Sequence, residues 1–244
     1  MKKLLIFLLV SLLFILLTFF PMHFYLRILT IILALPFVYI AWIISYSYYQ
    51  FAAFGGNYQS KIHDLIVAKV NGEEEGKILD IGTGSGSLII KLAKAFPESL
   101  LTGIDYWGKD WEYSKAQSQR NAEIEGVSDQ INFLKASAAN LPFINDEFDT
   151  IVSCLTFHEV KEEKNKSEVM KEALRVLKPG GKFVFLDLFR DEKIFGKEKD
   201  LLITLKKHGV SELKSYKLAK VIKLPKLLLN KKVLGNAMLL IGRK

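Results

Sequence analysis

A glycine-rich loop follows an apolar stretch in the middle third of the chain and reads Asp80-Ile81-Gly82-Thr83-Gly84-Ser85-Gly86. Glycine allows a tight turn here and lets a ligand approach the backbone without meeting a Cβ atom. A helix that begins directly after the loop offers unpaired N–H groups and a partial positive charge, which favour an anionic group. The segment is therefore typical of an α/β domain that binds a ligand at the end of its first strand.

Strand-like and helix-like segments alternate after this loop. Strands are predicted at 77–81, 100–104, 130–135, 148–153 and 182–187, with two more around 213–222 and 237–241. Helices are predicted at 86–95, 111–125 and 167–177. Because apolar, β-branched strands that alternate with helices form parallel sheets covered on both faces, the fold class is α/β. We expect a doubly wound, Rossmann-like, seven-stranded and mostly parallel sheet.

The spacing of the glycines narrows the choice of ligand. A dinucleotide fingerprint requires G-x-G-x-x-G, whereas this loop reads G-x-G-x-G, and the G-K-[S/T] of a phosphate-binding loop is absent. A second acid, Asp105, ends the next predicted strand, where a carboxylate can accept hydrogen bonds from both hydroxyls of a ribose. A purely structural glycine turn and an NAD(P)-binding oxidoreductase remain as alternatives.

Further motifs occur in a familiar order along the chain. They are Ala139-Asn140-Leu141-Pro142-Phe143 after the third predicted strand, Phe148-Asp149-Thr150-Ile151-Val152-Ser153 as the fourth, and Leu174-Arg175-Val176-Leu177-Lys178-Pro179-Gly180-Gly181-Lys182 before the fifth. With the glycine loop, they resemble the class I S-adenosylmethionine-dependent methyltransferases that act on small molecules and lipids. The resemblance covers about residues 76–244 and implies S-adenosyl-L-methionine as cofactor and methyl transfer as the reaction.

The resemblance also implies a cofactor site, which comprises Asp80, Gly82, Thr83, Gly84, Gly86, Asp105, Tyr106, Ser137, Ala138 and Cys154. In the family the glycines pack against the methionine part, and the acid matching Asp80 supports the loop and the amino group. The acid matching Asp105 holds the ribose, and Tyr106 would flank the adenine. Where the family has an acid for the adenine amino group this chain has Ser137-Ala138, which puts that side-chain contact in doubt.

His158 is the candidate catalytic residue, because it follows the fourth predicted strand and titrates near neutral pH. It could take a proton from an acceptor that arrives protonated, or it could simply pack beside the cofactor. Glu159 could orient it or could lie on the following helix. We expect Cys154 to be a small apolar residue near the sulfonium and not a nucleophile. His63 and His208 have no companions at metal-ligand spacing, so no metal site is expected.

The first fifty residues have a different composition. Two uncharged apolar runs, at 4–20 and 28–44, each reach the roughly 17–25 residues that a transmembrane helix needs. Trp42, Tyr46 and nearby tyrosines lie where an interfacial aromatic belt is expected. We predict two transmembrane helices in residues 1–50, a linker and leading helix in 51–75 and the methyltransferase domain in 76–244. A secretory signal and a buried soluble pair of helices are the alternatives.

Lys2 and Lys3 favour an N-terminus inside the cell, and two spans then place the domain inside as well. The cofactor is made in the cytoplasm, so we expect a multi-pass protein of the cell membrane with a cytoplasmic catalytic domain. Cys154 is the only cysteine, so an intrachain disulfide is impossible.

The net charge of +8 is concentrated near the end of the chain, where residues 206–232 contain many lysines and one acid, Glu212. Such a stretch suits an anionic membrane surface, nucleic acid or plain solvation. No nucleic-acid partner is expected, because no reading motif accompanies it. On a membrane-tethered chain a small-molecule or lipid-soluble acceptor is expected. A catalytically inactive cofactor-binding membrane module is the alternative function.

Overall fold

The computed structural model describes residues 2–70, 76–108, 113–231 and 233–244, with side chains from residue 5 onward. It divides into two compact units, Met1–Ser60 and Lys61–Lys244, which are considered separately below. Residues 71–75 at the end of the expected linker and leading helix, and the expected helical residues 111 and 112, lie outside the described residues.

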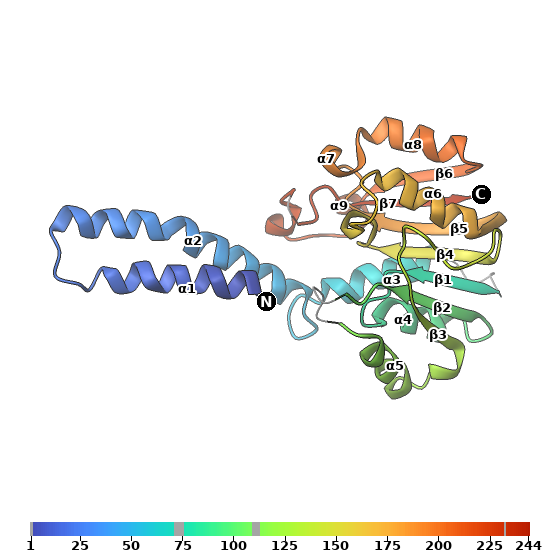
Figure 1. Cartoon of the computed structure of the whole chain (residues 1–244), viewed down its shortest axis with the longest axis horizontal. Coiled ribbons are helices and arrows are strands. Elements are labelled where there is room, and N and C mark those ends of the chain that lie inside the picture. Colours follow the sequence, from blue (N-terminus) through green and yellow to red (C-terminus); the bar gives the residue numbers. More distant parts are fainter. Residues whose placement is uncertain (1, 71–75, 109–112, 232) are drawn as a thin grey trace. The chain divides into compact units, whose positions relative to one another are not determined.

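The first unit contains two helices, α1 (Lys2–Leu17) and α2 (Phe24–Phe51), that pack against each other (Figure 1, blue). Phe37 of α2 lies between Phe7 and Phe14 of α1, with ring centroids 6.2 and 5.6 Å away. Small buried side chains, Ala34 and Ala41, complete the described packing on α2. Most of the other apolar side chains of both helices are exposed, which is not the pattern of a soluble core.

Among the described helices, α2 alone is long and apolar enough to cross a membrane by length and composition. Only 11% of its 18-residue apolar window is buried within the structure. The apolar part of α1, Leu5–Leu17, is shorter than a typical span. Of the two spans expected at 4–20 and 28–44, only the second corresponds to a candidate membrane span. The helix bounds also differ from the expected ones: α1 ends at Leu17, and α2 begins at Phe24 and continues to Phe51. A multi-pass anchor is not supported.

The second unit is an α/β domain built on a seven-stranded sheet of order β3-β2-β1-β4-β5-β7-β6. The strands are β1 (Lys77–Ile81), β2 (Leu100–Asp105), β3 (Ile131–Lys135), β4 (Phe148–Cys154), β5 (Leu177–Asp187), β6 (Glu212–Lys217) and β7 (Met238–Arg243). β7 is antiparallel to both of its neighbours, and all other pairs are parallel. The predicted fold class is confirmed.

The helices of this unit are α3 (Tyr58–Val70), α4 (Ser87–Ala95), α5 (Lys115–Ile124), α6 (Lys166–Val176), α7 (Glu192–Phe195), α8 (Glu198–Lys207) and α9 (Leu218–Val221), with short 3₁₀ turns η1 (Ser128–Gln130), η2 (Phe157–Glu159) and η3 (Lys226–Leu229). Local sequence sets several of their starts. The Ser114 hydroxyl accepts a hydrogen bond from the Gln117 N–H and caps α5, and Asn165 caps α6 in the same way.

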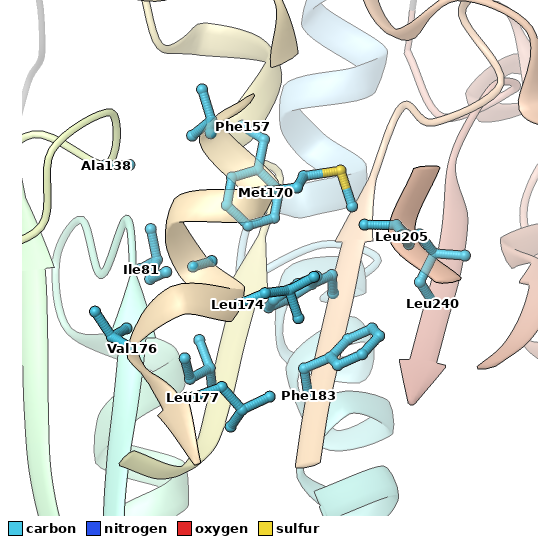
Figure 2. Packing of buried hydrophobic residues seen from close by; sticks show 14 of the residues in the cluster. Ile81, Ala138, Phe157, Met170, Leu174, Val176, Leu177, Phe183, Leu205 and Leu240 are labelled. Carbon is cyan, nitrogen blue, oxygen red and sulfur yellow. The ribbon is translucent and has the colours of Figure 1, made fainter. Parts of the chain in front are cut away.

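Alternation along β5 places helices on both faces of the sheet. Lys182 donates from Nζ to the Val70 carbonyl of α3 (2.6 Å), whereas the next residue, Phe183, belongs to a core cluster with Leu174 of α6. Because neighbouring residues of a strand point to opposite faces, α3 and α6 cover opposite faces. Figure 2 shows Phe183, Leu174, Leu205 of α8 and other buried side chains of this cluster packed together.

One predicted strand is partly wrong. The expected strand at 213–222 ends at Lys217, and Leu218–Val221 forms the short helix α9. Leu218 is fully buried and its N–H bonds to the Ala237 carbonyl (3.0 Å), so the chain turns here to begin its return toward β7. Tertiary burial therefore outweighs the strand propensity of Val221 and Ile222.

Candidate cofactor and catalytic site

The order of the strands defines where a ligand can bind. β1 lies between β2 and β4, so the chain winds in opposite directions from the middle of the sheet. In such open sheets the crevice outside the carboxyl ends of the strands, at the point of reversal, is the usual ligand site. The glycine loop leaves β1 at this point, and Asp105, Cys154 and Asp187 end β2, β4 and β5 at the same edge.

The loop has a backbone that only glycine adopts easily. Gly82, Gly84 and Gly86 have φ angles of +81°, +55° and +85°. The N–H groups of Gly82 and Thr83 both donate to the Ile104 carbonyl, at 2.8 and 2.9 Å. The loop is thus fixed to the end of β2 before any ligand binds.

Asp105 joins the loop to the segment after β2. Its Oδ2 accepts from the Gly84 N–H (2.9 Å) and its Oδ1 from the Trp107 N–H (2.8 Å). The Trp107 indole N–H donates to the Gly84 carbonyl (2.9 Å), and so does the Ser118 hydroxyl (2.7 Å). A carboxylate has about four acceptor positions, so Asp105 retains capacity for further donors. Trp107 and Ser118 were missed by the sequence analysis, because nothing in their spacing distinguishes them from packing residues.

Asp80 is a buried acid with an unfilled hydrogen-bonding capacity. Its side chain lies below the loop, is 1% exposed, and its Oδ2 has no hydrogen-bond partner within the described part of the chain. Burial raises its pKa to about 7; the neighbouring Thr83 side chain opposes the rise, and the negative charge of Asp105 adds to it. A buried carboxylate without a partner is costly, so this position favours a ligand that brings a donor or a positive charge.

Gly82 also meets a residue that the sequence analysis did not consider. A Cβ at Gly82 would lie 2.0 Å from Oγ1 of Thr156, just after β4. Thr156 therefore explains why glycine is needed at this position without invoking a ligand. Among the described residues, a Cβ at Gly84 would come within 4 Å of Tyr113 alone, at 3.7 Å, so Gly84 is more open than Gly82.

The remaining predicted cofactor residues lie along the same edge. The Ala136 N–H donates to the Asp105 carbonyl (3.0 Å), which brings the Ser137-Ala138 pair beside the end of β2. The Ser137 hydroxyl accepts from the Ala139 N–H (3.2 Å), and Ala138 is buried in the core. Tyr106 is 54% exposed, with the Lys135 ammonium 5.7 Å from its ring centroid.

Cys154 ends β4 beside two acids. Burial raises the pKa of its thiol far above the ordinary value, and the charges of Asp80 and Asp187 raise it further. The thiolate is the reactive form of cysteine, so the environment keeps this side chain neutral and unreactive. That Cys154 is not a nucleophile stays a prediction, and this environment favours it.

His158 is held by a buried acid that the sequence analysis did not select. The His158 Nδ1–H donates to Oδ1 of Asp187 (2.6 Å), and the His158 backbone N–H approaches Oδ2 (3.3 Å). Asp187 is 0% exposed and ends β5. With Nδ1 bound, Nε2 is the nitrogen available to accept a proton, and it lies 3.4 Å from Oε1 of Glu159.

The charge around His158 decides its protonation. Burial opposes the charged imidazolium, but the hydrogen bond and charge of Asp187 and the charge of Glu159 outweigh it, so the pKa of His158 lies above its ordinary value. A fixed tautomer and a raised pKa together make Nε2 a competent proton acceptor. The only signal in the sequence was that Asp187 ends one predicted strand and His158 follows another.

Within the described residues no group of three or more histidines, cysteines and acids is placed to hold a metal ion. The structure brings the glycine loop, Asp80 and Asp105 together at the carboxyl edge of the sheet, where β1 and β2 end. Cys154 and His158 follow from the adjacent strand. Tyr106 and Ser137 lie at the end of the crevice near β2 and β3.

Comparison with known proteins agrees with this arrangement. Residues 79–185 match the methyltransferase domain family. The chain is 34% identical over 122 residues to a ubiquinone/menaquinone biosynthesis C-methyltransferase of Geotalea daltonii, covering 50% of this chain and 49% of that protein. It is 32% identical over 129 residues to a sterol 4-C-methyltransferase of Caenorhabditis elegans, covering 53% and 36%. The chain thus spans about half or less of these relatives.

Solved structures share the fold. An S-adenosylmethionine-dependent methyltransferase from Aquifex aeolicus superposes with a TM-score of 0.54 at 17% identity, covering 74% of this chain and 88% of that one. A geranyl diphosphate C-methyltransferase from Streptomyces coelicolor gives 0.58 at 12% identity, covering 76% and 79%. The sequence match favours a methyltransferase over a dehydrogenase. Residues 79–185 of the α/β unit are therefore similar to the methyltransferase domain family, and the unit has the fold of the solved methyltransferase structures named here.

Proposed function

We propose that this protein is an S-adenosylmethionine-dependent methyltransferase, anchored in the cell membrane by α2, that methylates a lipid-soluble small molecule. The observation that supports it most directly is the buried Asp80 carboxylate, whose Oδ2 lacks a hydrogen-bond partner among the described residues, next to a loop of three glycines with positive φ. This is the environment that a ligand with an ammonium group and a flat, ribose-linked portion would complete.

The residues present fit this cofactor. Asp80 offers a buried carboxylate to the amino group, and Gly84 lets the methionine portion approach the backbone. Asp105 keeps acceptor capacity for ribose hydroxyls while its two bonds hold the loop in place. Tyr106 offers an exposed ring for the adenine, and Ser137-Ala138 offers a hydroxyl and backbone groups in place of the family's acid. Thr83 and Gly86 maintain the loop, since the Gly86 N–H donates to the Thr83 carbonyl (2.8 Å).

When bound, S-adenosylmethionine supplies an electrophilic methyl group on a sulfonium. The protein's contribution is to align the acceptor and to exclude water. His158 is assigned as the general base: its Nε2 takes the proton of an acceptor hydroxyl or acidic carbon while Asp187 holds the ring and stabilises the imidazolium that forms. Cys154 stays a neutral thiol that lines the crevice without taking part in bond formation.

The lipid-soluble acceptor is supported by two independent points. The relatives named above are a quinone-biosynthesis C-methyltransferase and a sterol C-methyltransferase. The apolar, exposed surface of α2 would also keep the enzyme where such acceptors dissolve. We place the catalytic unit on the cytoplasmic side, because the cofactor is made there.

The acceptor class is tested with the full-length protein in detergent and methyl-labelled S-adenosylmethionine. An organic extract of membranes and an aqueous metabolite extract are supplied separately, and S-adenosylhomocysteine and label are measured in each. Label in the organic fraction is expected. Label only in the aqueous fraction would refute the lipid-soluble acceptor, and cofactor binding without turnover on either extract would favour the inactive cofactor-binding module.

A further inference from the structure

The connection between β6 and β7 presents a row of exposed lysines. Its five described members, here called the basic segment, are Lys217, Lys220, Lys223, Lys226 and Lys231, all exposed. Two leucines between them, Leu218 and Leu228, are fully buried. Within the described part of the chain none of these lysines forms an ion pair, and the sequence has no Asp or Glu after Glu212. The positive charge is therefore not neutralised by the protein itself.

Strand register places this segment at the edge of the sheet that holds the active site. Met238, where the connection enters β7, pairs with Lys217 on one side and with Asp187 on the other. The Arg190 N–H, three residues beyond Asp187, donates to the Asn236 carbonyl (3.2 Å). Figure 1 shows α9 at the end of the strands opposite the C-terminus, in agreement with this register. The basic segment thus lies beside the residue that holds the proposed base.

The α/β unit also receives the chain at this edge. Lys182 bonds to Val70, the last residue of α3, near the amino end of the paired part of β5. Asp64 is ion-paired with Lys91 in the helix that starts directly after the glycine loop. These two contacts show that α3 runs from the carboxyl edge of the sheet toward the amino edge. Lys61, nine residues before Val70 on a helix that rises 1.5 Å per residue, therefore lies toward the carboxyl edge.

The lysines of the basic segment and the start of α3 lie toward the same edge of the sheet in an enzyme that we propose is tethered to the membrane. The chain enters the α/β unit at Lys61, so this is the edge at which the unit is joined in sequence to α2. Lysines near an anionic leaflet are attracted to it, and the attraction acts within about a Debye length. The point where the chain enters the α/β unit and the unneutralised lysines therefore lie toward the same edge of its sheet.

Resting on the membrane anchoring proposed above, we infer that the basic segment docks on the anionic headgroups of the bilayer, so that the active-site crevice opens toward the membrane surface. An apolar acceptor would then reach the crevice from the headgroup region without crossing bulk water. Leu229, 39% exposed within the segment, adds an apolar group that can enter the interface. Nucleic acid is the competing partner for such charge, and it is treated as an outcome of the test.

The test uses the full-length protein reconstituted in nanodiscs and backbone hydrogen exchange over residues 217–231. In phosphatidylglycerol discs exchange is expected to slow relative to phosphatidylcholine discs, and high salt is expected to reverse the effect. In the double variant Lys220→Gln/Lys223→Gln the equilibrium constant for docking is expected to be about 25-fold lower, because each lysine near the surface contributes about fivefold. The matched control is Lys206→Gln/Lys207→Gln, which removes two exposed lysines from the end of α8, before β6 and at the opposite edge, and should keep the protection.

Cofactor binding, measured on the same discs by equilibrium dialysis, separates the two proposals. Equal exchange in both lipids, in discs that contain the protein and bind S-adenosylmethionine, would overturn the docking and leave the methyltransferase intact. Protection by a duplex oligonucleotide but not by anionic discs would reassign the surface and overturn the membrane proposal. A chain that does not enter discs at all would overturn both the anchor and the docking.

Discussion

Protonation of Asp80 is expected to control the affinity for the cofactor. Its pKa is raised to about 7 in the unliganded site because the carboxyl is buried, with the charge of Asp105 adding to the effect. Only the ionised carboxylate pairs with an ammonium group, so the competent fraction falls as the pH falls through 7. The apparent dissociation constant is the intrinsic one divided by that fraction.

The magnitude follows directly from the pKa. At pH 7.5 about three quarters of Asp80 is ionised, and at pH 5.5 only about 3%, so binding weakens by about 25-fold between the two. The ligand's own α-amino group has an ordinary pKa of about 7.7–8.0 and remains largely protonated across this range. Asp80→Asn is expected to bind weakly and to lose the pH dependence.

Isothermal titration calorimetry of the full-length protein with S-adenosylhomocysteine at pH 5.5, 6.5 and 7.5 measures this. Asp129→Asn, an exposed acid before β3, is the matched control and should behave as the wild type. A wild-type dissociation constant that stays flat over the range would refute the role of Asp80. The same slope in Asp80→Asn would assign the titration to another group, such as His158.

Two further predictions concern the loop and the base. Gly82→Ala places a Cβ at a φ of +81° and against Thr156, so it should lower the free energy of unfolding in urea by about 2–4 kcal/mol. Gly126→Ala has a φ of +71° but open space around the new Cβ, so it should lower the free energy of unfolding by about 1–2 kcal/mol. Equal losses in the two variants would remove the role given to Thr156. His158→Gln should lower kcat by about 10²–10⁴-fold without changing cofactor affinity, and an unchanged kcat would exclude the base role. Asp187→Asn should lower kcat and also lower the pKa of His158, so the acid limb of the pH–rate profile should move to lower pH; an unmoved limb would mean that another group titrates.

Much of the fold was predictable because its signals are local. β1 was predicted to the residue, since Lys77–Ile81 is bounded by Gly76 and the glycine loop. β5 was predicted short, because Pro179 and two glycines looked like a turn although the strand begins at Leu177. The first membrane span was overestimated, because an uncharged run continues for three residues after α1 ends at Leu17.

The site was predictable where one segment of sequence builds it. The glycine loop, Asp80 and the acid at the end of β2 are read directly from spacing. The contacts of Trp107, Ser118 and Thr156 with the loop join residues between 23 and 74 positions apart, and no local pattern announces them. Asp187 was visible as the end of a strand, but its bond to His158 depends on the register of β4 against β5.

Binding of S-adenosylmethionine by the full-length protein tests the central claim most directly, with Asp105→Asn as the variant. Asparagine keeps the shape of the side chain but removes its charge and half of its acceptor oxygens. We predict saturable one-to-one binding by the wild type and a loss of at least tenfold in affinity in Asp105→Asn. Absence of binding by a folded wild-type protein, or equal affinity in the variant, would contradict the assignment of this crevice as the cofactor site.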